Sequence, residues 1–306
     1  MLDRVSDMIV PLPSADTTPF DAQASVSSPA LAGCTISGQG APVVMLHSSL
    51  ASKAQWLVLA ERMSSRFQVI ALDLWGYGDN PLPSVRERFS IDDEVRLVAG
   101  HVDRLVAPHV RVHVVGHSYG GLVALRFAQC MRGRVASLSL YEPVVFGMLE
   151  NEDEALADVT RLAGEIRRML ASEQRHDAAR AFVDFWNGDG AFASLSPGAR
   201  VGAARGMDKV ALDFRAAWHW RPDPDDLHRL VSPTLLLTGT RSPPVVQRIV
   251  KLLARRLPHS RVATLDAGHM GPLTAGQRVN PWIEAFVDMC AGRQQAAEQA
   301  TAEATR

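Results

Sequence analysis

One short run of the chain predicts chemistry directly: Gly-His-Ser-Tyr-Gly-Gly at residues 116–121. It matches the pattern Gly-x-Ser-x-Gly, in which a serine occupies a very tight turn between a strand and a helix. Such a turn leaves no room for side chains at Gly116 and Gly120. It lifts the Ser118 hydroxyl above the sheet edge, where the N-terminus of the next helix stabilises developing negative charge. The pattern predicts that Ser118 is a nucleophile; an ordinary glycine-rich turn is the alternative.

A serine nucleophile needs a neighbouring base, and His269 is the candidate. It lies in the run Asp-Ala-Gly-His-Met-Gly-Pro at residues 266–272, directly after the last apolar run. It follows Ser118 in the chain, which fits the order serine, acid, histidine. Of the ten histidines, it alone occupies a glycine-flanked loop after a terminal strand.

Two backbone amides are candidates for stabilising a tetrahedral oxyanion. One is the N–H of Tyr119, the residue after the nucleophile. The other comes from the run Leu-His-Ser-Ser-Leu at residues 46–50, which also follows an apolar run. We expect the Ser49 N–H to be the second donor, with Ser48 as the alternative. Either serine can also cap the next helix, because the oxyanion donor is a backbone group.

Short apolar runs must supply the strands that hold these residues. They lie at residues 42–46, 67–72, 110–115, 135–141, 234–238 and 261–265. Each is short and mostly apolar, which fits strands buried on both faces of a parallel sheet. Helical patterns lie between them, for example at residues 121–131 and 245–256. The alternation predicts an α/β fold with a mostly parallel central sheet flanked by helices.

The alternation stops between residues 147 and 229, which read as helices at 152–170, 178–186 and 197–209. A helical insertion of this kind predicts a cap over the carboxyl edge of the sheet, where ligands bind. The predicted domains are a flexible arm (1–32), a core (33–146 and 230–292), a helical cap (147–229) and a frayed helix or disordered tail (293–306).

Aromatic side chains are dense in the predicted cap. They are Phe182, Phe185, Trp186, Phe192, Phe214, Trp218 and Trp220. Rings at this density line an apolar acyl pocket or pack the cap onto the core, and we expect both uses.

Composition excludes several classes of protein. The 306 residues are 47% hydrophobic and 21% charged, which excludes a disordered chain, a collagen-like repeat and a disulfide miniprotein. The 32 basic and 33 acidic residues balance to a net charge of −1, so we expect a small-molecule partner, not nucleic acid or a membrane.

The three cysteines Cys34, Cys130 and Cys290 are far apart and have no metal-ligand spacing. The chain also has no secretory signal pattern and no apolar run near the roughly 20 residues that span a bilayer. These features predict a cytoplasmic protein without a metal. A homo-oligomer is left open.

The combined motifs resemble the α/β-hydrolase fold superfamily over about residues 35–290. The matching pieces are residues 47–49 with Trp56, 73–79, 116–121 and 268–269. The resemblance implies the α/β-hydrolase fold and a cofactor-free hydrolase of esters, lactones, amides or activated carbon–carbon bonds. Dehalogenases and epoxide hydrolases of this fold use an aspartate nucleophile, whereas Ser118 forms an acyl-enzyme or activates water.

The acid is where the chain departs from its family. The family usually carries an aspartate in a Gly-x-x-Asp loop after strand seven, but residues 239–242 read Gly-Thr-Arg-Ser. Ser242 has no charge with which to stabilise an imidazolium. Some members place the acid after strand six, and Glu142 matches that position. Asp266 is the reserve candidate, and a surface glutamate before a proline is the alternative reading of Glu142.

The sequence thus predicts a serine hydrolase of a small or medium acyl ester. Its predicted residues are the triad Ser118, His269 and Glu142 and the oxyanion donors Tyr119 and Ser49. A carbon–carbon bond or lactone hydrolase on the same triad is one alternative. A non-catalytic ligand-binding protein that keeps the fold is another, which the missing acid at Ser242 leaves open.

Overall fold

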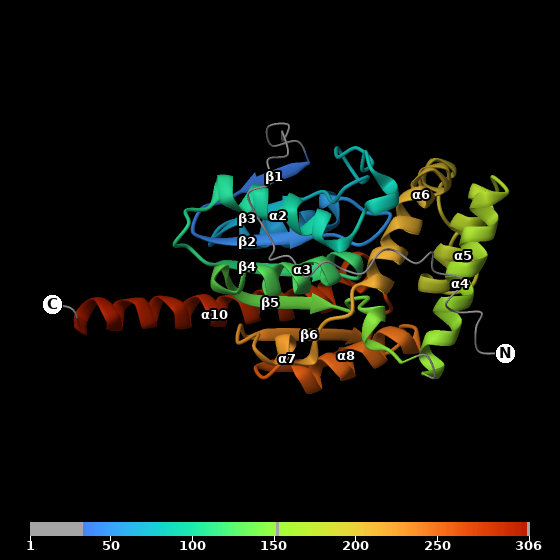
Figure 1. Ribbon diagram of the computed structural model, residues 1–306. Coiled ribbons are helices and arrows are strands. Elements are labelled where there is room, and N and C mark those ends of the chain that lie inside the picture. The colour runs from blue at the N-terminus through green and yellow to red at the C-terminus, as the bar shows by residue number, and fades with distance from the viewer. Residues whose placement is uncertain (1–32, 151–152, 305–306) are drawn as a thin grey trace.

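The computed structural model describes residues 33–150 and 153–304, and its centre is a seven-stranded sheet (Figure 1). The strand order is β1-β3-β2-β4-β5-β6-β7. The strands are β1 (Cys34–Ser37), β2 (Ala41–Leu46), β3 (Phe67–Leu72), β4 (Val112–His117), β5 (Val135–Tyr141), β6 (Thr234–Gly239) and β7 (Ser260–Leu265). All neighbouring strands are parallel except β1, which runs antiparallel to β3. The predicted α/β architecture with a mostly parallel sheet is confirmed.

Burial explains which strands the sequence predicts well. The central strands β4 and β5 are buried along their whole length, so they are continuous apolar runs. Strand β1 was not predicted, because this four-residue edge strand is half exposed and has no apolar run. The predicted strand 110–115 begins two residues later, at Val112.

Helices cover both faces of the sheet and enclose two apolar clusters. One face packs against α2 (Ile91–Leu105), α3 (Tyr119–Cys130) and α8 (Pro244–Arg256). The other packs against α1 (Leu57–Met63) and α10 (Gly276–Ala304). The alternation of side chains along a strand produces this division: Val44 faces the first cluster and Val43 the second.

The helical insertion lies between β5 and β6. It contains α4 (Glu154–Ala171), α5 (Arg175–Asn187), α6 (Pro197–His219) and α7 (Pro224–His228). Figure 1 shows α4, α5 and α6 together beyond the carboxyl ends of the strands, whereas α7 lies back beside α8. We call α4, α5 and α6 the cap helices. Their position agrees with the predicted cap, although its division from the core as a separate domain stays a prediction.

Two predictions concern the ends of the chain. The helix α10 continues to Ala304, so the described part of the predicted tail is helical, which is one of the two predicted alternatives. The predicted arm (1–32) lies outside the described residues. Short helices remain: α9 (Gly271–Thr274) and the 3-10 turns η2 (Lys53–Trp56), η3 (Arg86–Arg88), η4 (Arg132–Arg134) and η5 (Phe146–Met148). Across residues 33–150 and 153–304, no helix is both long and apolar enough to cross a membrane.

Candidate active site

Ser118 sits on the tight turn that joins β4 to α3. Its backbone has φ 54° and ψ −115°, a left-handed conformation that is strained for a residue with a side chain. The turn packs so closely that a Cβ on Gly116 would lie 2.5 Å from the Gly120 carbonyl oxygen. A Cβ on Gly120 would collide with the carbonyl oxygens of Leu46 and His47. The two glycines are therefore needed here for the steric reason that the sequence pattern indicates.

A hydrogen-bonded chain joins Ser118, His269 and Glu142. The Ser118 Oγ lies 3.0 Å from His269 Nε2, and His269 Nδ1 lies 2.7 Å from Glu142 Oε2. All three side chains are buried. If Nδ1 donates to the carboxylate, Nε2 is free to accept the serine proton. The structure thus brings together the three residues predicted as a triad.

The surroundings of Glu142 suit an ionised carboxylate. Its Oε1 accepts hydrogen bonds from the Thr238 hydroxyl and the Gly239 amide, each at 2.7 Å. Burial alone would raise the pKa of Glu142, but the hydrogen bond and charge of His269, helped by the Gly239 amide and Ser242, hold the pKa below its usual value. A carboxylate surrounded by donors stays charged at neutral pH.

The other two acid positions are placed differently. Ser242 is buried beside Glu142, on the loop after the neighbouring strand β6. Asp266 is exposed and forms ion pairs with Arg241 and Arg278. Of the two candidate carboxylates, the structure places Glu142 at the imidazole and Asp266 on the surface.

The two residues predicted to supply oxyanion amides line the same small cavity as the nucleophile. Ser49, Ser118 and Tyr119 all line it. The Ser48 amide already donates to Gln55 Oε1 at 3.1 Å, which argues against the alternative donor. Within the described residues, neither the Ser49 nor the Tyr119 amide donates to a protein group. Both are therefore available to an oxyanion.

The cavity has an empty volume of about 280 Å³ and mostly apolar walls. The remaining lining residues are Val144, Phe146, Phe182, Trp186, Val210, Asp213, Phe214 and Ala217. Three of the seven cap aromatics are among them, and the Trp186 ring lies 4.3 Å from the His269 ring between centroids. Another cap ring packs against the core, as Trp218 does against Phe146. The cap aromatics therefore divide between lining the cavity and packing, and an acyl group in the cavity stays a prediction.

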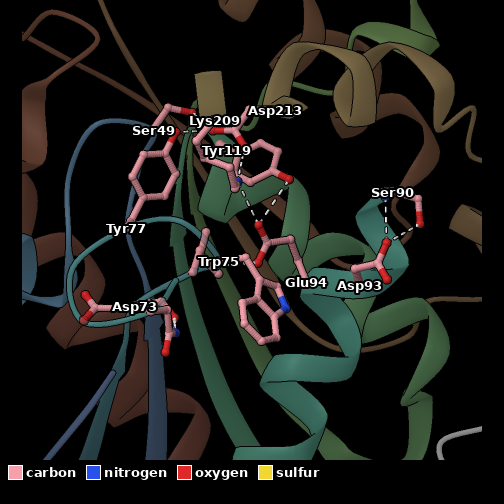
Figure 2. Close-up of polar contacts among 12 residues, drawn as sticks. Ser49, Asp73, Trp75, Tyr77, Ser90, Asp93, Glu94, Tyr119, Lys209 and Asp213 are labelled. Atoms are coloured by element: carbon pink, nitrogen blue, oxygen red, sulfur yellow. Dashed lines mark hydrogen bonds and ion pairs between the residues drawn. The ribbon is translucent and has the colours of Figure 1, made fainter. Parts of the chain in front are cut away.

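A buried ionic cluster next to the cavity was missed by the sequence analysis (Figure 2). The Lys209 ammonium pairs with Asp213 and, at 2.9 Å, with Glu94 Oε1. Asp213 also accepts hydrogen bonds from the hydroxyls of Ser49 and Tyr77. A signal was present, since Lys209 and Asp213 are spaced i,i+4 on one helix. The predicted helix ended at residue 209, whereas α6 continues to His219.

The described part of the chain contains no group of three or more His, Cys, Asp or Glu side chains that could hold a metal ion. A buried serine, an imidazole and a carboxylate joined by hydrogen bonds can support acyl transfer, and two residues with unpaired amides line the same cavity.

Comparison with known proteins identifies the family. The chain is 28% identical to a pimeloyl-[acyl-carrier protein] methyl ester esterase of Aeromonas hydrophila, over 82% of this chain and 96% of that protein. It is 32% identical to the dihydrolipoyllysine-residue acetyltransferase component of the acetoin cleaving system of Pseudomonas putida, over 81% of this chain and 64% of that protein.

A solved structure agrees with these sequence matches. A thermophilic esterase from Thermogutta terrifontis superimposes with a TM-score of 0.67 and 25% identity, covering 84% of this chain and 93% of that one. The sequence profile of the alpha/beta hydrolase family matches residues 43–282, which span most of β2, the strands β3 to β7, the cap helices and His269. The chain belongs to the alpha/beta hydrolase family.

Proposed function

We propose that this protein is a serine hydrolase that cleaves a small or medium acyl ester. The observation that carries the proposal is the chain of contacts Ser118–His269–Glu142, at 3.0 and 2.7 Å, beside two open amides. Similarity to an Aeromonas methyl ester esterase and a Thermogutta esterase supports the choice of ester bonds.

The geometry supports a two-step reaction through an acyl-enzyme. His269 Nε2 takes the proton of Ser118 as its oxygen attacks the ester carbonyl, and Glu142 stabilises the imidazolium through Nδ1. The amides of Ser49 and Tyr119 stabilise the oxyanion. His269 then gives the proton to the leaving alcohol, and a water molecule activated by the same imidazole releases the acid.

The cavity supports a compact, apolar acyl group. The cavity is small, and its walls are chiefly aromatic and aliphatic. The rings of Phe182, Trp186 and Phe214 come from the cap helices, so the cap contributes to substrate choice. A carbon–carbon bond or lactone hydrolase stays an alternative prediction.

The test uses p-nitrophenyl esters from acetyl to octanoyl, together with a fluorophosphonate probe. We expect turnover of the shorter esters, a burst of p-nitrophenol and labelling of Ser118. Ser118→Ala should remove labelling and lower kcat by several orders of magnitude while the protein stays folded. Wild-type protein that neither turns over an ester nor reacts with the probe would instead favour the non-catalytic binding protein.

The remaining expectations from the sequence stay predictions. They are a cytoplasmic location, a small-molecule substrate without nucleic-acid or membrane partners, and a function without a cofactor. Gel filtration with light scattering would establish whether the chain forms a homo-oligomer.

A further inference from the structure

Both proposed oxyanion donors send their side chains into the same buried ionic cluster (Figure 2). The Ser49 hydroxyl donates to Asp213 Oδ2 at 2.6 Å. The Tyr119 hydroxyl donates to Glu94 Oε1 at 3.4 Å. The Lys209 ammonium joins the two carboxylates, so a single cation connects the anchors of both donors. We call Lys209, Glu94 and Asp213 the Lys209 cluster.

The Lys209 cluster is deeply buried. Lys209 and Glu94 are 0% exposed, and Asp213 is 4% exposed. The ammonium also lies over three aromatic rings, with its Nζ 4.6 Å from the ring centroid of Tyr119, 4.7 Å from that of Tyr77 and 5.0 Å from that of Phe89. Ion pairs and ring contacts together compensate for the lost hydration of the charge. Such fully enclosed groups have little freedom to move, so they can hold a neighbour in place.

The cluster connects parts of the fold that are distant in the sequence. Lys209 and Asp213 lie on the cap helix α6, whereas Glu94 lies on α2 in the core. Ser49 follows β2, and Tyr119 begins α3. The cluster thus links one cap helix to each of the two loops that supply a proposed oxyanion amide.

We propose, on the basis of the function proposed above, that Lys209, Glu94 and Asp213 are positioning residues. They hold the Ser49 and Tyr119 amides at the spacing that an oxyanion needs. That spacing then depends on how α6 packs against the core. The physical reason is preorganisation: donors fixed before the reaction cost no reorganisation in the transition state. The cap helix therefore contributes to catalysis through the oxyanion hole, in addition to lining the cavity.

Two conservative variants test the inference without removing a buried charge. Ser49→Ala and Tyr119→Phe each delete one hydroxyl, and each keeps its backbone amide. Asp213→Asn then keeps the shape of the cluster and removes a charge. Loss of a whole oxyanion donor costs about 10²–10³ in kcat, so we expect a looser donor to cost less, about tenfold in each hydroxyl variant. These substitutions change only polar atoms and leave the apolar side chains of the cavity in place, so KM should change by less than about twofold.

A second measurement distinguishes positioning from general support of the fold. A boronic acid forms a tetrahedral adduct with Ser118 and needs the oxyanion amides, whereas the product carboxylic acid binds as a ground state. In the variants, the inhibition constant of phenylboronic acid should rise in parallel with the fall in kcat, and that of the product acid should stay constant.

Asp153→Asn is a matched control. Asp153 pairs with Arg248 at 2.8 Å and so joins α4 to α8, another link between cap and core. Asparagine keeps the helix cap that Asp153 supplies and loses only the ion pair. We expect wild-type kcat and wild-type inhibition by phenylboronic acid.

The outcomes separate this inference from the proposed function. If wild-type protein is labelled by fluorophosphonate, but Ser49→Ala, Tyr119→Phe and Asp213→Asn all keep kcat and boronic acid affinity within twofold, the positioning role is wrong and the serine hydrolase stands. A parallel loss in the Asp153→Asn control would also overturn it. If wild-type protein is neither labelled nor active, both proposals fail. Should Asp213→Asn not fold, the two hydroxyl variants decide the question alone.

Discussion

Glu142→Gln is the substitution for which the structure predicts the largest effect with the smallest change of shape. The carboxylate receives three donors: the Thr238 hydroxyl and the Gly239 amide at Oε1, and His269 Nδ1 at Oε2. Glutamine offers only one oxygen and one NH₂ group. Its oxygen should occupy the Oε1 position, because the Gly239 N–H can only donate.

This orientation turns the NH₂ group toward His269. The imidazole must then accept at Nδ1 and carry its proton on Nε2, where it cannot take the proton of Ser118. The same substitution type in other triads lowers kcat by about 10⁴-fold, which corresponds to ~5 kcal/mol of transition-state stabilisation. We expect a loss of this size with little change in melting temperature.

The assay is the initial rate of p-nitrophenyl ester hydrolysis, with circular dichroism to verify folding. Asp266→Asn is the control, since that exposed carboxylate pairs with surface arginines and should leave kcat near the wild-type value. Ser242→Asp in the Glu142→Gln background should restore part of the activity, because Ser242 lies beside Glu142. A Glu142→Gln variant within tenfold of wild type, together with an inactive Asp266→Asn, would refute the assignment of the acid.

Three further predictions concern packing, pH and substrate size. Gly116→Ala should lower the free energy of unfolding by about 1–3 kcal/mol in urea titrations, because its Cβ would meet the Gly120 carbonyl; an unchanged midpoint would contradict this. Burial and then the nearby Arg111 lower the pKa of His113 from 6.5 to about 4. Between these pH values His113 is protonated in the unfolded chain and neutral in the native state. The free energy of unfolding should therefore fall as the pH drops from about 6.5 toward 4. This costs up to ~2 kcal/mol by about pH 5, and His113→Gln should show a shallower loss. Val210→Phe should fill the cavity and shift kcat/KM toward shorter acyl chains, whereas an unchanged chain-length profile would show that the acyl group binds elsewhere.

Much of the fold could be predicted because the strands β2 to β6 are buried on both faces and are therefore apolar runs. The turn at Ser118 needs glycines whatever surrounds it. Strand β1 was not predicted, because an exposed edge strand needs no apolar pattern. The sequence left two alternatives for residues 293–306, a frayed helix or a disordered tail, because this segment has no large apolar side chains to reveal a buried face.

The site was predictable where its chemistry is local in the sequence. Ser118 and His269 each lie in a glycine-flanked loop after a strand, and Glu142 follows the strand after the nucleophile helix. The Lys209 cluster depends on tertiary packing, since Glu94 and Lys209 are 115 residues apart. In the sequence, a lysine and an acid on a helix read as a solvated surface pair; only the position of α6 against the core shows that they are buried.

The place where the chain leaves and re-enters the sheet has a consequence for protein engineering. The cap helices begin after β5 and return to β6, and these two strands are neighbours. An insertion whose two ends lie next to each other can be replaced by the cap of another protein. Ser118, Glu142 and His269 all lie outside the exchanged segment and stay in the protein. The Lys209 cluster determines which foreign caps are compatible with this core. A foreign cap without a cation at the position of Lys209 would leave the buried negative charge of Glu94 without its ion pair. Chimaeras that carry over the Lys209–Asp213 pair should therefore fold more often than those that do not.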